Sequence, residues 1–298
     1  MFISKLLFTT GELTLEILFI IITAIGISTQ HISRKSYSNK DGKGALSFSA
    51  SSAFVSLLVY LICSHGNLNF SRQTISFAFV FAIFFSMGIL FSLLAINAGP
   101  LSLTSLITSY SLFIPTFYGI FMLNEPFTYL SGIGLILLTV SLFYTNFKRN
   151  DKGEKLSLRW AVYAFLSFAG NGICSTVQKI YQMKSDGAYK SEFMVIAYIV
   201  SAAILFVAAA IYEREDILRN IKKGIGEIFV SGVANAVVNL LVMVLSLRLA
   251  ASFVFPIISA GSIMLTVLIS VMYYKEKLSP AQKKGILFGL LAIIFLNI

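Results

Sequence analysis

The chain has 298 residues, of which 57% are hydrophobic and only 12% are charged. Soluble domains carry about 25% charged residues, so this composition excludes an ordinary soluble protein and indicates an integral membrane protein. The formal net charge of +10 does not indicate a nucleic-acid-binding protein, because Lys and Arg stand in short segments between apolar runs, where they set orientation.

The apolar runs predict an all-α integral membrane protein. Uncharged runs of about 20 residues match the hydrocarbon core of a bilayer, which is roughly 30 Å thick, at a rise of about 1.5 Å per residue. No charged residue lies between Arg72 and Glu125, and this stretch is long enough for two helices joined by a turn at Gly99-Pro100. Ten transmembrane helices fit the chain, at residues 12–31, 45–64, 74–97, 100–123, 128–147, 159–181, 191–212, 228–248, 250–273 and 279–298.

The same pattern of residues occurs at two junctions between predicted helices. In "FMLNEPFT" and in "MYYKEKLS" an apolar run ends in a glutamate, Glu125 and Glu276, and a hydroxyl residue follows three positions later, Thr128 and Ser279. Ser and Thr are preferred N-caps, so each junction is expected to end one helix and to cap the next. Each glutamate should then lie beside a helix N-terminus, where negative charge is favourable.

A second repeated pattern lies near the start of each half of the chain. "AIGISTQHISRK", which begins at Ala24, aligns with "GNGICSTVQKIY", which begins at Gly170. The first five helices (residues 1–150) would then match the last five (residues 151–298). Because five is odd, the second repeat must enter the membrane from the opposite side. The sequence therefore predicts two inverted five-helix repeats, a common plan of secondary transporters.

The charged segments between the apolar runs predict the orientation of the chain in the membrane and one surface helix. Loops after odd-numbered helices hold 17 Lys and Arg residues and the remainder of the chain holds 6, which places the odd-numbered loops in the cytoplasm and both termini outside. The segment 213–227, "EREDILRNIKKGIGE", is amphipathic and is expected to form a helix on the membrane surface.

The junctions "LNEPFT" and "YKEKLS" and the segment "GICSTVQK" resemble the drug/metabolite transporter (DMT) superfamily, in its ten-helix branch with two EamA-type repeats. The resemblance covers nearly the whole chain. It implies a secondary carrier for small metabolites, amino acids, nucleotide-sugars or cationic drugs, with a pathway between the repeats lined mainly by helices 1, 3, 4, 6, 8 and 9. It also implies cytoplasmic termini, against the charge count. The basic residue that ends the family's first-helix pattern is Lys179 in the second copy, and Ser33 takes that place in the first.

Polar side chains within the expected pathway are the candidate site residues, because polar groups inside membrane helices are costly unless they find partners or water. Asn235 and Asn239 are four residues apart and should share a helix face. The predicted substrate-binding residues are Tyr110, Ser111, Asn171, Lys179, Asn235, Asn239, Ser259 and Ser262. Two alternatives stay open. Ser and Thr also bond their own helix or let helices pack closely, and a lysine near a helix end also reaches for the headgroups.

Catalytic patterns are missing from the sequence. It contains no nucleophile–base constellation, no metal-ligand cluster, no phosphate-binding Gly loop and only two His residues. We therefore expect a protein that is not an enzyme and that has no cofactor and no metal site. Cys63 and Cys174 both fall in apolar runs and are expected to be structural thiols rather than a disulfide.

The favoured function is secondary transport of a small organic metabolite, amino-acid-like or similar, across the cytoplasmic membrane by alternating access, in the direction of export. The first alternative is a carrier of multiple drugs or quaternary ammonium cations, which would need an acidic or aromatic pocket. A non-transport membrane scaffold is a further alternative. The expected partners are a small-molecule substrate, with the proton as a candidate coupling ion, and the lipid bilayer, and the expected oligomeric state is a monomer or a homodimer.

Overall fold

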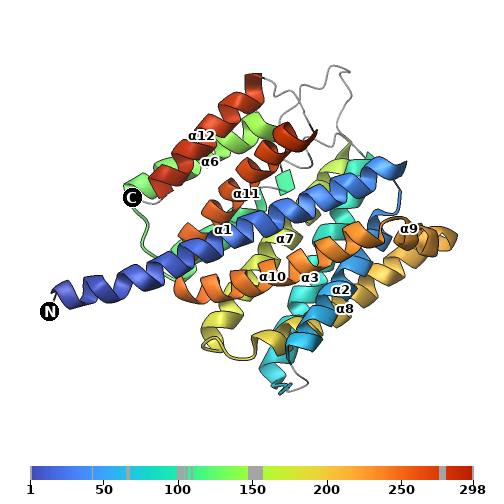
Figure 1. Cartoon of the computed structure of the whole chain (residues 1–298), viewed down its shortest axis with the longest axis horizontal. Coiled ribbons are helices and arrows are strands. Elements are labelled where there is room, and N and C mark those ends of the chain that lie inside the picture. Colours follow the sequence, from blue (N-terminus) through green and yellow to red (C-terminus); the bar gives the residue numbers. More distant parts are fainter. Residues whose placement is uncertain are drawn as a thin grey trace.

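The computed structural model describes residues 2–41, 43–64, 68–98, 104, 107–108, 110–146, 157–274 and 280–296, and these residues are almost entirely helical. Figure 1 shows the helices, which are, in chain order, α1 (Phe2–Asp41), α2 (Ala45–Cys63), α3 (Arg72–Ala98), the short η1 (Tyr110–Leu112), α5 (Phe113–Met122), α6 (Tyr129–Asn146), α7 (Leu158–Lys184), α8 (Lys190–Tyr212), the short η2 (Arg214–Asp216), α9 (Ile217–Lys223), α10 (Ile225–Arg248), α11 (Ala251–Tyr274) and α12 (Pro280–Leu296). The predicted turn at Gly99-Pro100 and the second junction at Glu276 lie outside the described residues.

Several of these helices have the length and composition of membrane spans. Five are long and apolar enough to cross a bilayer, at Leu15–Lys40, Ala45–Cys63, Arg72–Ala98, Lys190–Tyr212 and Ile225–Arg248. Three shorter apolar helices lie at Tyr110–Met122, Tyr129–Tyr144 and Ala251–Thr266. The all-helical fold of the described residues agrees with the predicted class, whereas the count of ten spans and the inverted repeat stay predictions.

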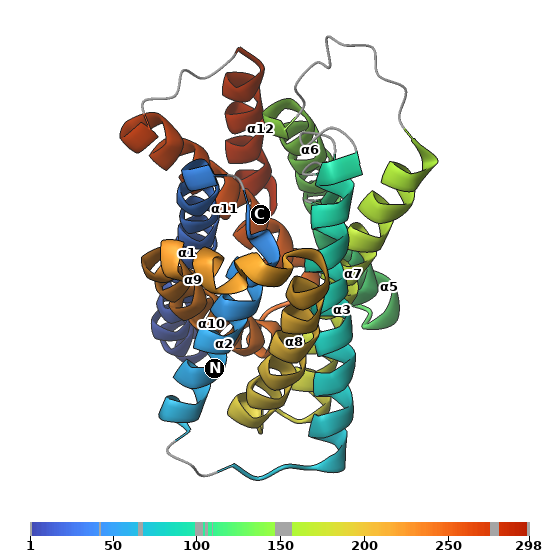
Figure 2. The same cartoon turned by 90° about the vertical axis from the view of Figure 1, so that its right-hand side faces the viewer.

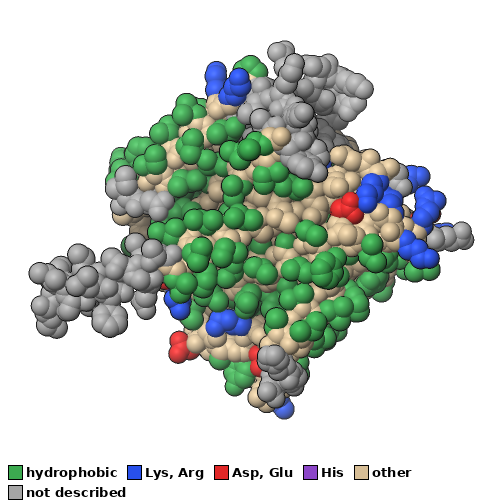
Figure 3. All heavy atoms as spheres, in the orientation of Figure 1, with side chains coloured by type: hydrophobic (Ala, Val, Ile, Leu, Met, Phe, Trp, Pro, Cys, Tyr) green, Lys and Arg blue, Asp and Glu red, His purple; other side chains and the backbone are tan. Residues whose placement is uncertain are grey.

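The outer surface of the helices is apolar. Large hydrophobic side chains such as Ile62, Phe121 and Met272 are each about 70% or more exposed, at 72%, 70% and 73%. Figure 3 shows one face of the molecule on which hydrophobic side chains dominate, with Lys and Arg gathered toward its edges. In water such a surface would be unfavourable, so lipid is the medium that suits it.

The two halves of the chain pack on each other rather than side by side as separate units. α3 packs on α7 and α8, and α10 packs on α1 and α2. α2 also packs on α8, α5 on α7 and α11, α1 on α11, and α6 on α12. Figures 1 and 2 show α6 and α12 as a pair at one side of the molecule, and both termini lie on the left in Figure 1.

α3 and α7 pack closely, and the two helices run antiparallel. A Cβ atom on Gly170 would lie 2.6 Å from the backbone nitrogen of Gly88, so only glycine allows the two backbones to approach this far. Further along, the hydroxyl groups of Thr74 and Tyr181 are hydrogen-bonded at 3.0 Å. α3 therefore begins beside the end of α7.

The segment 213–227 differs from its prediction. A 3-10 turn at Arg214–Asp216 precedes α9, which has only seven residues. Asn220 points inward and is 1% exposed, whereas Leu218 is 72% exposed. The prediction of one amphipathic helix over the whole segment is therefore wrong in extent, because the 3-10 turn precedes α9 and Gly224 separates α9 from α10.

Candidate functional site

A buried ion pair joins the two halves of the chain. Glu125 follows α5 and Lys179 lies near the end of α7, and the ammonium Nζ of Lys179 is 3.1 Å from the carboxylate oxygen Oε1 of Glu125. The two side chains are only 10% and 5% exposed. Nζ also donates a hydrogen bond of 2.9 Å to the carbonyl oxygen of Leu249. A buried charge is tolerated only when it is paired and hydrogen-bonded, and both charges meet this condition.

The same carboxylate holds the N-terminus of α11. The backbone N–H of Ala251 donates to Oε1 of Glu125 and that of Ser252 donates to Oε2, both at 2.9 Å. Burial alone would raise the pKa of Glu125, but these two N–H groups and the Lys179 ammonium lower it by more, so its pKa lies below the ordinary value. Glu125 is therefore ionised at neutral pH and is held by three donors from the second half of the chain.

The location of Glu125 corrects one detail of its prediction. Negative charge at a helix N-terminus was expected, but at the start of the next helix, α6. At that place Thr128 acts alone, as its hydroxyl accepts from the backbone N–H of Ser131 at 3.0 Å. Glu125 instead serves α11, which lies on the other half and far away in the sequence. Lys179 does not reach the headgroups either, because the residue is 4% exposed.

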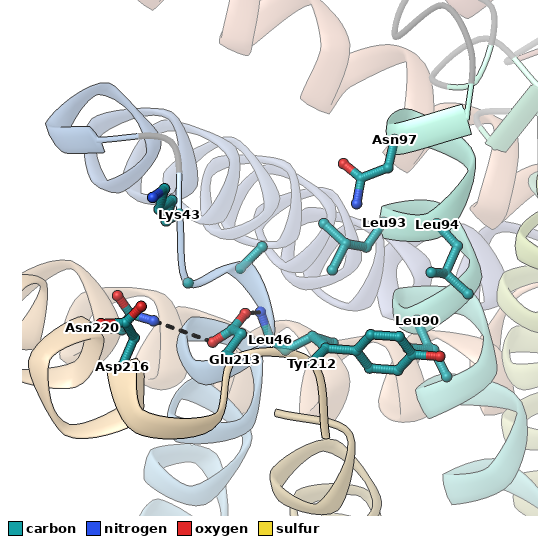
Figure 4. Close-up of a pocket in the computed structure, with 12 residues that line it drawn as sticks. Lys43, Leu46, Leu90, Leu93, Leu94, Asn97, Tyr212, Glu213, Asp216 and Asn220 are labelled. Atoms are coloured by element: carbon teal, nitrogen blue, oxygen red, sulfur yellow. Dashed lines mark hydrogen bonds between the residues drawn. The ribbon is translucent and has the colours of Figure 1, made fainter. Parts of the chain in front are cut away.

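A cavity of about 320 Å³ lies at the other end of α3, and we call it the α3 cavity. It is lined by Lys43, Gly44, Ala45, Leu46, Leu90, Leu93, Leu94, Asn97, Tyr212, Glu213, Asp216 and Asn220. Figure 4 shows the leucines of α3 on one wall, with Glu213 and Asn220 on the opposite one. The walls thus come from both halves of the chain, and an apolar side faces a polar one.

The polar wall of the α3 cavity repeats the arrangement at Glu125. Glu213 accepts hydrogen bonds from the backbone N–H groups of Leu46 at 2.7 Å and of Ser47 at 3.0 Å, at the start of α2. It also accepts from the Ser47 hydroxyl and from the side-chain nitrogen of Asn220. Glu213 was not among the predicted site residues, because a loop glutamate carries no signal of the helix start that it binds.

The ion pair and the α3 cavity lie at opposite ends of the molecule. Thr74, in the first turn of α3, contacts Tyr181, two residues beyond Lys179 on α7. Leu93, which lines the cavity, is 19 residues further along α3, a rise of about 28 Å. This distance is close to the thickness of a bilayer core, roughly 30 Å.

Comparison with known proteins finds a family match in the second half of the chain. The sequence model of the EamA-like transporter family, which is part of the DMT superfamily, matches residues 154–298. These residues are similar to that family. A solved structure, described only as a crystal structure of a protein, is 12% identical over 95% of this chain and 98% of its own, with a TM-score of 0.73. That likeness shows a shared fold and nothing more. No curated protein matches the chain.

The half of the chain that matches this family contributes Lys179 and most of a buried polar chain. Nε2 of Gln178 donates to Oδ1 of Asn239 at 3.0 Å, and Nδ2 of Asn239 donates to Oδ1 of Asn235 at 2.9 Å. Asn235 in turn donates to the hydroxyl of Ser56 on α2 at 3.2 Å. Two predicted site residues, Asn235 and Asn239, are thus brought together on α10, and Gln178 joins them although the sequence analysis did not select it.

The polar chain meets α2 near the middle of that helix. Ser56 is ten residues along α2 from Leu46, which lines the α3 cavity, a rise of about 15 Å. This rise is about half the thickness of a bilayer core, which is roughly 30 Å. Transporters with inverted repeats bind substrate near the bilayer midplane.

The other predicted site residues are dispersed. The Tyr110 hydroxyl donates to the carbonyl oxygen of Thr139 at 3.1 Å, and Asn171 donates to that of Ser167 on its own helix at 3.1 Å. Ser262 donates to the carbonyl oxygen of Ser259 at 2.9 Å. Ser111 lies in η1 and is partly buried. None of the eight predicted residues lines the α3 cavity.

Metal binding finds no support in the described part of the chain, which contains no group of three or more His, Cys, Asp or Glu side chains that could hold an ion. Cys63 and Cys174 are free thiols, the first exposed and the second buried. The protein is a multi-pass membrane protein, on the evidence of the family match and of its apolar helices.

Proposed function

We propose that the chain is a secondary transporter that exports a small organic metabolite across the cytoplasmic membrane by alternating access, with amino acids as the substrate class. One observation carries the proposal. The α3 cavity lies between the two halves at one end of α3, while a buried ion pair joins the halves at the other end. A carrier that works by alternating access needs one such end open while the other is closed.

The pattern of helix contacts supports an inverted repeat. If the first five long helices are exchanged for the last five in order, the α3–α7 contact becomes the α10–α1 contact, and α3–α8 becomes α10–α2. The α5–α7 contact likewise becomes α11–α1, while α2–α8, α5–α11 and α6–α12 map onto themselves. Such an exchange is what a two-fold axis between the halves would produce, and with five helices in each half that axis would lie in the membrane plane.

The polar chain on α10 is our proposed centre of the substrate site, with Asn235 and Asn239 as direct ligands. Their amides hold each other and Gln178 in this state. An amide can donate to a carboxylate and accept from an ammonium group, so one pair of asparagines suits a zwitterion. Tyr110, Ser111, Asn171, Lys179, Ser259 and Ser262 remain proposed as further lining residues of the pathway.

The test is transport of radiolabelled amino acids by the purified protein in proteoliposomes. We expect counterflow of at least one amino acid, and an initial rate for Asn239→Ala about tenfold lower, since each lost polar contact to a substrate is worth about 1.5 kcal/mol or more. Asn69→Ala is the matched control, because Asn69 lies in the α2–α3 loop away from both the cavity and the polar chain. Equal rates for Asn239→Ala and the control would overturn the site, and no counterflow of any amino acid would overturn the substrate class.

A second candidate function is a carrier of organic cations. It is favoured by Tyr212, Glu213 and Asp216, an aromatic and two acidic residues that line the α3 cavity together. Both carboxylates already have partners, Glu213 at the start of α2 and Asp216 at Arg219, so we rank it second. Uptake of tetraphenylphosphonium by the same proteoliposomes, with no counterflow of amino acids, would reverse this order.

A further inference from the structure

The Glu125–Lys179 ion pair has the location and the contacts of a gate. It joins three segments that meet at one end of the molecule: the turn after α5 in the first half, and α7 and the start of α11 in the second. Its charges are shielded from solvent, and the carboxylate has three donors. Separating the halves at this end would require all three contacts of Glu125 to break together.

The composition of the contact makes it a two-state element rather than a flexible one. An ion pair in a low-dielectric environment is favourable only at close range, and a buried charge without its partner is strongly unfavourable. The end that holds Glu125 is therefore closed with the pair formed, or open with both groups in water. A partly separated pair would lose the attraction between the charges without gaining their hydration by water.

We propose that Glu125, Lys179 and the first turn of α11 form the gate that closes one end of the transport pathway, and that the gate must open in every transport cycle. This inference rests on the proposed function. The structure then represents the state in which the α3 cavity is open and the opposite end is closed. Opening of the gate is coupled to closing of the cavity, because α3 and α7 pack along their length from one end to the other.

Accessibility to thiol reagents tests the coupling without knowledge of the substrate. Cys63 and Cys174 are first replaced by Ala, and one reporter cysteine is introduced at each end. Ser252→Cys reports on the gate, since Ser252 is 6% exposed and its N–H binds Glu125. Leu93→Cys reports on the cavity that it lines. Labelling rates are measured with a membrane-impermeant maleimide on the full chain in proteoliposomes that have been made permeable.

The gate predicts opposite changes at the two reporters. With Glu125 and Lys179 intact, position 93 should be labelled rapidly and position 252 slowly. Glu125→Gln should raise labelling at position 252 about tenfold and lower it at position 93, because weakening one state of a two-state equilibrium populates the other. Lys179→Met should act in the same direction. Lys184→Met, one turn or so further along α7 at an exposed position, is the matched control and should change neither rate.

Each other outcome overturns the proposal. Increased labelling at both positions would mean that the pair only stabilises the fold, and a cysteine at Ser201, which is fully buried on α8, would then be labelled as well. Unchanged labelling at position 252 in both variants would mean that the pair closes nothing. Transport provides a separate readout: opposite changes in labelling without counterflow of any amino acid would sustain the gate and overturn the proposed substrate.

Discussion

Glu125 and Glu213 bind helix N-termini in the same way at opposite ends of the molecule. Each carboxylate comes from one half of the chain and accepts from the first backbone N–H groups of a helix in the other half, α11 for Glu125 and α2 for Glu213. They differ in their remaining neighbours. Glu125 has the buried ammonium of Lys179, whereas Glu213 has a serine hydroxyl and an amide and lines a cavity.

The difference shows how one local interaction can have two uses. A carboxylate at a helix N-terminus gains from the helix dipole and from the hydrogen bonds together. With a buried lysine beside it, the contact tolerates no water and should be either intact or fully broken. With neutral partners beside a cavity, the contact can exchange hydrogen bonds with water at a small cost. The first contact suits a closed end of the molecule and the second an open one.

Replacement of Glu125 should have the largest effect on stability. Glu125→Ala leaves the Lys179 ammonium buried with one carbonyl partner and leaves two N–H groups of α11 without an acceptor. Breaking a buried pair from one side costs about 3–5 kcal/mol. The free energy of unfolding of the purified protein in detergent should fall by this amount. A loss no larger than that of Glu213→Ala would show that the two glutamates are equivalent.

Acidification should act on the same contact. The pKa of Glu125 is lowered in the folded protein, so its ionised form stabilises the fold at and above the ordinary carboxylate pKa. This part of the stability should disappear as the pH falls through the lowered pKa of the folded state. The difference in unfolding free energy between the wild type and Glu125→Gln should therefore shrink at acidic pH. A difference that grows on acidification would contradict the assigned ionisation.

The Gly88–Gly170 contact should come next, because α3 and α7 connect the two ends of the molecule. A methyl group on Gly170 would meet backbone atoms of α3, which cannot rotate away. Overpacking of this kind costs about 1–3 kcal/mol, so Gly170→Ala should reduce thermal stability by that order. Gly226→Ala on α10 is the matched control, because no atom lies within 4 Å of its added Cβ. Equal melting temperatures for the two variants would show that α3 and α7 can move apart to accept the methyl group without loss of stability.

Replacement of Glu213 should cost less than replacement of Glu125. Glu213→Ala removes the acceptor of Leu46 and Ser47 but leaves no buried ion behind. Loss of a helix cap costs about 0.5–2 kcal/mol, and water in the adjoining cavity can take over part of the contact. Thermal unfolding of the two Ala variants, measured side by side, compares the end that holds the buried ion pair with the end that holds the α3 cavity. A larger loss of stability for Glu213→Ala than for Glu125→Ala would contradict the assignment of Glu125 to the closed end and Glu213 to the open end.

The helical fold was predictable from the sequence, but the long-range contacts of its charged side chains were not. Apolar periodicity and length place helices such as α8 and α11 within a residue or two of their predicted bounds, because hydrocarbon thickness limits their length. The repeated junction also selected Glu125. Its partner could not be inferred, since nothing local in "LNEPFT" indicates that α11 begins beside it. The asparagine pair on α10 was found because residues four apart share a helix face, a purely local rule.

The smallest effect is expected at the exposed ion pair of Lys40 and Glu227, which joins the end of α1 to the start of α10. Its atoms are closer than those of the buried pair, at 2.7 Å, but its side chains are 39% and 19% exposed. Lys40 also has the carbonyl of Lys223 as an acceptor and Glu227 has the hydroxyl of Ser36 as a donor. Each partner therefore keeps a hydrogen bond and access to water when the other is removed. Double-mutant cycles with Lys40→Ala and Glu227→Ala should give a coupling energy of about 1 kcal/mol or less, as for other surface pairs.

The same cycle on Glu125 and Lys179 should give several times that value, because neither group there can turn to solvent. Equal coupling energies for the two pairs would mean that burial does not set the strength of the contact, and the argument for a gate at Glu125 would lose its physical basis.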